Sequence, residues 1–177
     1  QLRQQPGLVP SQVDRELAQN YFTDSVRDPA RVALLAERLS SPESLEAGEL
    51  NRIQLGFARA ELLERLGRRD EARAVAQRMR AELAAAKPAS RGRGYAAVLA
   101  VRLDAFLGNT AAARAGAASL ISDPPADYMW PVETGRGLMV ACAQIGDADA
   151  AFALAERAMD RFSPSHFAPM ITGTVDI

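Results

Sequence analysis

The sequence predicts an all-α fold built from helix pairs, and two observations support this. First, a corner pattern occurs three times: an apolar residue, a glycine, and an alanine five positions after the glycine. The corner glycines are Gly67, Gly108 and Gly146, so the spacing is 41 and then 38 residues. Second, the segments beside each corner carry apolar residues at helical spacing, and no segment alternates convincingly as a strand. Each corner therefore predicts a tight turn between antiparallel helices, and three corners in one phase indicate a repeat.

The residues around each glycine suit a helix end followed closely by a helix start. A helix often ends with one residue at positive φ, where glycine has no Cβ to clash. We expect Thr110 and Asp147 to cap the following helices, because their side-chain oxygens can accept hydrogen bonds from free backbone N–H groups. Asp70 and Glu71 would lie in the first turn of their helix, where negative charge suits the helix dipole. The alanine five positions after the glycine lets the second helix pack closely on the first.

Helical patterning extends from residue 12 to residue 164, which predicts one helical domain. Residues 1–11 form a flexible lead-in and residues 165–177 an irregular tail. The expected helices occupy about 12–22, 29–39, 45–66, 70–86, 95–107, 110–121, 128 or 132 to 145, and 148–162, with a loop at 87–94. They form about four pairs, and Arg27 stands in the place of the corner glycine in the first pair. In the last helix we expect the apolar stripe Phe152, Ala155, Ala158 and Met159 to face inward.

Composition excludes several classes of protein. Hydrophobic residues make up 48% of the 177 residues and aromatic residues 6%, with alanine dominant, which is typical of closely packed helices. The formal net charge is -1, so no global basic field favours nucleic-acid binding. No apolar run reaches the roughly 18 residues of a membrane span, so we expect no membrane insertion by this segment. Richness in alanine and arginine suggests a bacterial origin, with both cytoplasm and periplasm open as compartments.

The residue types needed for catalysis or metal binding are scarce. Cys142 is the single cysteine, lies in an apolar helical segment and is expected to be a buried, inert thiol. His166 is the single histidine and lies in the Pro-flanked tail, so the two residues do not make a metal site. The glycines of Arg91–Gly94 follow no strand and lack a Walker lysine, so this segment is a solvated linker or an anion contact. We expect no cofactor and no metal.

The corners resemble those of the tetratricopeptide repeat (TPR), although their spacing exceeds the usual length of about 34 residues. That pattern has a small residue in the first helix (helix A), glycine at the turn, and small residues at set positions in the second helix (helix B). The resemblance implies a right-handed solenoid whose concave helix A face holds a peptide or a partner helix. The matching positions are Ala60, Gly67, Ala72, Ala76 and Met79 in the second pair; Val101, Gly108, Ala113, Ala117 and Leu120 in the third; and Met139, Gly146, Ala151, Ala155 and Ala158 in the fourth.

Carried over in phase, the resemblance predicts a groove of polar and aromatic side chains. Arg102 and Arg136 would be able to pair with a carboxylate of the partner. The alternative is that these residues only solvate the inner face. The predicted groove residues are Gln54, Phe57, Glu61, Tyr95, Arg102, Glu133 and Arg136.

Two further surfaces leave alternatives open. Tyr128 and Trp130 either pack across the junction of the third and fourth pairs or form an exposed aromatic anchor. The arginines of residues 65–80 are interleaved with acids, which indicates a solvated face with local ion pairs, or else a patch for RNA or an acidic partner.

Three functions remain, in order of preference. The first is a non-enzymatic module that binds a protein or peptide through the helix A face. The second is a sensor or dimerisation segment of a larger bacterial signalling protein, an expectation prompted by the absence of an initial methionine at Gln1. The third is an all-helical enzyme that uses carboxylate or arginine chemistry.

Overall fold

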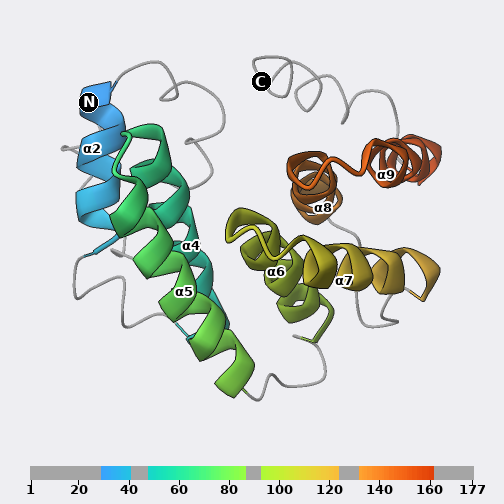
Figure 1. The fold of residues 1–177 in the computed structure, drawn as a ribbon, viewed down its shortest axis with the longest axis horizontal. Helices are drawn as coiled ribbons and strands as arrows, with labels where there is room; N and C mark the ends of the chain where they lie inside the picture. The colour runs from blue at the N-terminus through green and yellow to red at the C-terminus, as the bar shows by residue number, and fades with distance from the viewer. Residues whose placement is uncertain (1–28, 41–47, 87–92, 124–131, 162–177) are drawn as a thin grey trace, which may run out of the picture. The chain divides into compact units, whose positions relative to one another are not determined.

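The structure, a computed structural model, describes residues 29–40, 48–86, 93–123 and 132–161. These ranges contain helices and no strand, so the all-α prediction is confirmed for them (Figure 1). The helices are α2 (Pro29–Arg38), α4 (Glu49–Arg65), α5 (Arg69–Ala85), α6 (Arg93–Phe106), α7 (Thr110–Ser122), α8 (Val132–Gln144) and α9 (Ala148–Arg161). None of the helices in the described ranges is long and apolar enough to cross a membrane.

The chain divides into two compact units, residues 1–79 and residues 80–177. The boundary falls inside helix α5, so it does not coincide with a loop. In unit 1, α2 packs on α4. In unit 2, α6 packs on α7 and α8, and α7 packs on α8 and α9. The predicted domain limits near residues 12 and 164 lie outside the described residues and stay predictions.

All three predicted corners are present and share one backbone geometry. Gly67, Gly108 and Gly146 have φ angles of 74°, 78° and 73°, and they are the positive-φ residues of the described chain. At each corner the glycine N–H donates to the carbonyl three residues earlier. The N–H of the residue after the glycine donates to the carbonyl five residues earlier, at N–O distances of 2.8–2.9 Å. This pair of bonds is the Schellman motif, which satisfies carbonyl groups that a helix end leaves without partners.

One of the two predicted helix caps is confirmed and the other is wrong. Asp147 caps α9, since its Oδ1 accepts a hydrogen bond from the Ala150 N–H at 3.2 Å. Thr110 is the first residue of α7, and the capping position belongs to Asn109, which makes no side-chain capping bond. The reason is that the Asn109 amide donates instead to the Asp104 carboxylate at 3.1 Å.

Small residues set the close approach of the helices. Ala72 and Ala113, five positions after their glycines, are fully buried, and Ala151 is half-buried. Gly56 of α4 serves the same purpose in unit 1, because the Met79 thioether leaves no room for a Cβ at this position. The core of unit 2 comprises Val98, Val101, Ala105, Ala113, Ala117, Leu120, Leu138, Ala141, Cys142 and Leu154.

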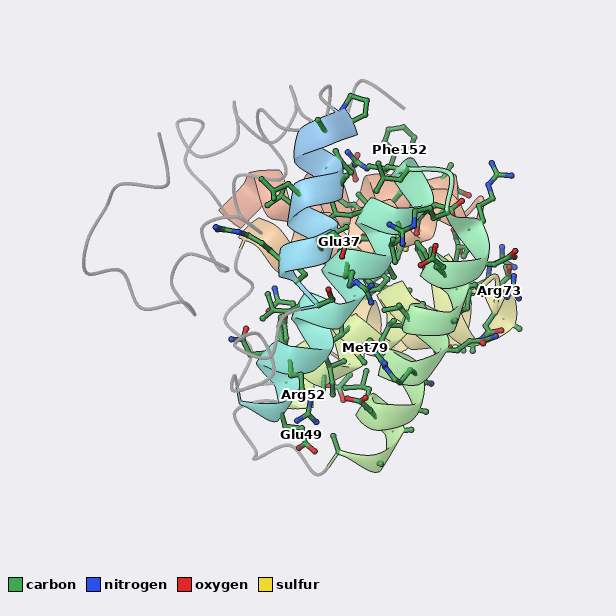
Figure 2. The ribbon with its side chains drawn as sticks, turned by 90° about the vertical axis from the view of Figure 1, so that its left-hand side faces the viewer. Glu37, Glu49, Arg52, Arg73, Met79 and Phe152 are labelled. Carbon is green, nitrogen blue, oxygen red and sulfur yellow. The ribbon has the colours of Figure 1, made fainter. Side chains whose placement is uncertain are left out.

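The predicted inward stripe of the last helix is wrong at Phe152, which is 70% exposed (Figure 2). Leu154, 1% exposed, takes the inward position. With about 3.6 residues per turn, residues two apart point to nearly opposite sides of a helix, so burying Leu154 turns Phe152 outward. Ala155 is half-buried, and the side chains of Ala158 and Met159 lie outside the described set.

We expect Gly108→Ala to lower the free energy of unfolding by about 1–2 kcal/mol, the cost of holding an L-residue at positive φ. No heavy atom lies within 4 Å of the added Cβ, so the backbone alone sets this cost. Urea unfolding followed by circular dichroism measures it. Gly48→Ser is the control: Gly48 has a φ of -53° and the same open space, and serine suits the N-cap position that Gly48 occupies, so we expect no loss. Equal losses in the two variants would contradict the corner geometry.

Candidate functional site

The predicted groove residues of unit 1 lie on α4, and one of them belongs to the core. Gln54 and Glu61 are half-buried and lie two turns apart on one side of the helix. Phe57 is 2% exposed, so it packs in the hydrophobic core and offers no surface to a partner. The periodicity placed Phe57 on the apolar stripe, which its burial confirms, and the carry-over from the resembling repeat wrongly placed it in the groove.

The predicted groove residues of unit 2 are described only in part. Tyr95 and Arg102 are half-buried and lie two turns apart on α6, so they share one side of that helix. Glu133 and Arg136 belong to α8, but their side chains lie outside the described set. Tyr128 and Trp130 also lie outside the described residues. The described part of unit 2 therefore brings together one pair of predicted residues, Tyr95 and Arg102.

Arg102 of α6 lies across a glycine of helix α8. A Cβ added to Gly137 of α8 would stand 2.9 Å from Arg102 Cδ and 3.2 Å from its Nε. Gly137 is buried, and only the absence of its side chain allows the arginine stem to rest there. Sequence reasoning missed Gly137, although a glycine inside a helical pattern is unfavourable and often marks a close approach.

Ion pairs link each corner with the helix that precedes its pair. At the first corner Glu37 of α2 meets Arg68, with an O–N distance of 3.5 Å. At the second, Arg80 of α5 meets Asp104, four residues before Gly108, at 3.1 Å. At the third, Arg114 of α7 meets Asp147, directly after Gly146, at 3.2 Å. In each case a residue within four positions of the corner glycine is contacted by an earlier helix.

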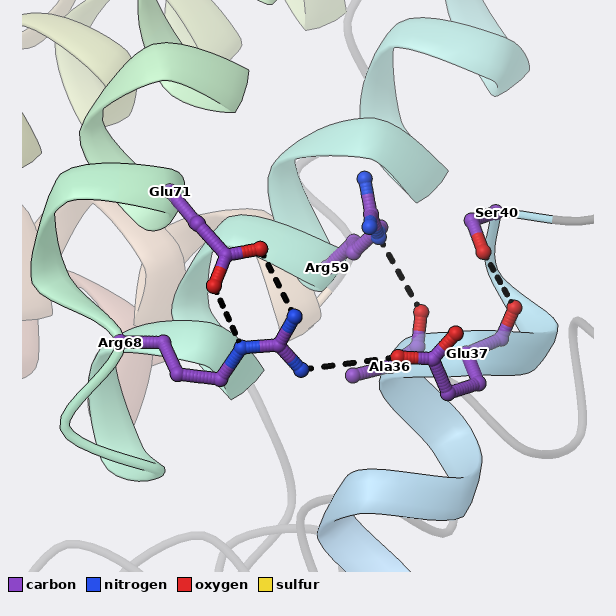
Figure 3. Close-up of polar contacts among 6 residues, drawn as sticks. All are labelled: Ala36, Glu37, Ser40, Arg59, Arg68 and Glu71. Carbon is purple, nitrogen blue, oxygen red and sulfur yellow. Dashed lines mark hydrogen bonds and ion pairs between the residues drawn. The ribbon is translucent and has the colours of Figure 1, made fainter.

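The first corner has the most exposed of these networks (Figure 3). Arg68 donates to both carboxylate oxygens of Glu71 at 2.7 Å and 2.7 Å, which lowers the pKa of Glu71 and raises that of Arg68. Arg59 donates from Nε to the Ala36 carbonyl at 3.2 Å, near the end of α2. Arg69 lies 3.4 Å from Glu64. Arg68 and Arg69 thus form the local ion pairs expected of a solvated face.

The second corner contains the one charged side chain that is buried among the described residues, Asp104, which is 5% exposed. Its two oxygens accept hydrogen bonds from Arg80 Nε and Nη2, each at 3.1 Å, and Oδ1 also accepts the Asn109 amide. Leu63 and Cys142 occupy the same position at the other corners and are fully buried. Sequence reasoning missed Asp104; alignment of the three corners would have shown one charge at an apolar position. With both oxygens engaged, this carboxylate is suited to fixing the corner rather than to proton transfer.

Cys142 is buried, as predicted, and is 0% exposed. Burial raises the pKa of its thiol, and the nearby Asp147 carboxylate raises it further, so the nucleophilic thiolate is disfavoured. Within the described ranges, no group of three His, Cys, Asp or Glu side chains is arranged to hold a metal ion. His166 lies outside those ranges.

No protein-family model matches the chain, and comparison with curated proteins and with solved structures gives no match either. The function is therefore argued from the residues of this chain alone.

We expect Arg80→Met to lower the free energy of unfolding by about 2 kcal/mol, because it leaves the buried Asp104 carboxylate without its cation. Arg114→Met is the matched control: its side chain is 55% exposed, so the expected loss is at most about 1 kcal/mol. Adding Asp104→Leu to Arg80→Met should recover most of the loss, since Leu63 fills the same position at the first corner. Urea unfolding of the four proteins tests this, and equal losses for the two arginines would refute it.

We expect Cys142 to react slowly with a thiol reagent such as DTNB in the native protein and quickly in 6 M urea, about a hundredfold or more apart. The raised pKa of the Cys142 thiol also determines how the stability of the fold depends on pH. A thiol whose pKa is higher in the folded than in the unfolded state stabilises the fold at pH values below the pKa of the unfolded thiol. This contribution to the free energy of unfolding is lost as the pH rises through the pKa of the folded thiol. Labelling kinetics measure the reactivity, and urea unfolding between pH 7 and 9 measures the pH dependence of stability; a native labelling rate equal to that of free cysteine would contradict the burial.

Proposed function

We propose that the chain is a TPR-like stack of helix pairs that binds a protein or peptide through its helix A face. Three corners of one geometry support the repeat, since a single corner would be ordinary in any helical protein. The contacts in unit 2 are those of stacked pairs: helix A on helix A (α6 with α8) and helix B on both helices of the next pair (α7 with α8 and α9).

The observation that carries the binding proposal is the placement of Arg102. Its stem rests on Gly137 of the next helix A, so the guanidinium is held at the seam of two helices rather than on a mobile surface. Tyr95 lies on the same side of α6. An arginine and a tyrosine on a preformed seam suit recognition of a peptide that carries a carboxylate, because arginine binds carboxylates bidentately and both residue types are common at binding hot spots.

Selection from a random peptide library tests the proposal, because it does not require the partner to be identified. A displayed library of random 12-residue peptides is selected on the immobilised 177-residue chain, and the dissociation constant of the best synthetic peptide is measured by fluorescence anisotropy. We expect acidic peptides, and about tenfold weaker binding by Arg102→Ala, the loss of one charge-assisted contact. Arg136→Ala should weaken binding as well.

Arg73→Ala is the matched control, since Arg73 is an exposed arginine on α5, a helix B. It should leave the affinity unchanged. Failure to select any peptide, or equal affinity of all four proteins, would contradict the proposal. Circular dichroism of each variant separates lost binding from lost folding.

A further inference from the structure

One face of each helix B is the face that meets the following pair. The contacting residue is Glu37 on α2, ten positions after Arg27, which stands in the place of the corner glycine. On α5 it is Arg80, thirteen positions after Gly67, and on α7 it is Arg114, six positions after Gly108. Residues at six, ten and thirteen positions lie on one side of a helix, because each residue turns the helix by about 100°. We call this side the next-pair face.

Helix α9 carries the same face, and no helix pair follows α9 in the described ranges. Phe152 lies six positions after Gly146, the position that Arg114 occupies on α7, and it is 70% exposed. Glu156 lies ten positions after Gly146, the position that Glu37 occupies on α2, and it is exposed as well. Asp149, one turn before Phe152, is a second exposed carboxylate on this side. The inter-pair contact surface therefore continues onto the last helix with an aromatic side chain flanked by two acids.

We propose that the next-pair face of α9 (Asp149, Phe152 and Glu156) docks a helix pair of a partner protein whose corner carries arginine or lysine directly after its glycine. The chemistry follows from the first corner, where Glu37 at the equivalent position meets Arg68, the residue after Gly67. Glu156 supplies the same anion for a partner cation. Phe152 supplies a large apolar anchor, and aromatic residues, phenylalanine among them, are enriched at protein–protein interfaces.

The charges of the chain disfavour a second copy as the occupant. Two α9 faces packed together would bring Asp149 and Glu156 against the same acids of the other copy. Among the corners that the structure describes, the one with an arginine after its glycine is already engaged, because Arg68 bonds Glu71 and Glu37 within its own unit. A second copy is accordingly an outcome of the test rather than the expectation.

The probe is a synthetic, fluorescently labelled helix pair with the sequence of Glu49–Ala85, cross-linked between its two helices so that it is helical before titration. It presents a Gly-Arg corner and is titrated into the full 177-residue chain. We expect Phe152→Ala to weaken binding about 30-fold, as at a hot spot, and Glu156→Arg about fivefold, as for a rim ion pair. A probe that carries Arg68→Glu should bind the wild-type chain more weakly. It should regain affinity for the Glu156→Arg chain, because the ion pair between probe and chain is then restored with its charges reversed.

Leu34→Ala is the matched control for Phe152→Ala, since Leu34 is a large apolar side chain, 58% exposed, on α2. It should leave the affinity unchanged. Absence of binding, or equal binding by the wild type and Phe152→Ala, would overturn the proposal. Weaker binding by the Glu37→Arg variant, with binding by Glu156→Arg unchanged, would also overturn the proposal. The probe would then be replacing the chain's own α4 and α5 in their contact with α2.

Sedimentation equilibrium of the full chain covers the remaining outcome. A dimer that Phe152→Ala dissociates would make a second copy the occupant and overturn the choice of a partner protein, whereas a monomer supports it. Peptide binding at Arg102 lies on a different helix face, so either proposal can fail without the other.

Discussion

The positive φ of three glycines is the constraint on which the described fold depends. At each corner one left-handed residue ends a helix, and the next helix begins two residues later, at Arg69, Thr110 and Ala148. That geometry places the alanine five positions after the glycine at the first full turn of the new helix, where its backbone N–H bonds the carbonyl of the residue after the glycine. The small side chain faces the first helix, so the same few residues set both the reversal and the spacing of the pair.

The corners also determine how one pair meets the next. The three inter-pair ion pairs all end on a residue within four positions of a corner glycine, namely Arg68, Asp104 and Asp147. We expect these ion pairs to differ in strength because their side chains differ in exposure to water. Asp104 is 8% exposed in its side chain, whereas Glu37 is 63% exposed and is screened by water. The three corners thus share one backbone geometry, and the junctions between pairs differ in the charged residues that form their ion pairs.

The frame was predictable from the sequence, and the particular side chains were not. Glycine and helical spacing are local signals, so the corners and the helices between them follow from short windows. Phe152 was misplaced because an apolar stripe does not say which of its members faces the core; Leu154 decided the orientation of α9. Phe57 was misplaced by the resemblance to the repeat, which assigned a buried member of the stripe to the groove. Asp104 and Gly137 were missed for a different reason. Their meaning depends on Arg80 and Arg102, which lie far away in the sequence, and a periodicity carries no information about such partners.

Alignment of the helices on their corners recovers part of what periodicity misses. Six positions after the corner the sequence has Arg73, Arg114 and Phe152, and the first two are the polar residues expected on a surface between charged junctions. A phenylalanine in this column is the exception. A side chain that stays in water in both the folded and the unfolded state gains nothing from folding, whereas burial against a partner contributes roughly 25 cal/mol per Å² of apolar surface removed from water. The largely exposed ring of Phe152 is therefore available for burial against the partner proposed above, and the flanking acids Asp149 and Glu156 favour a partner with a cationic surface.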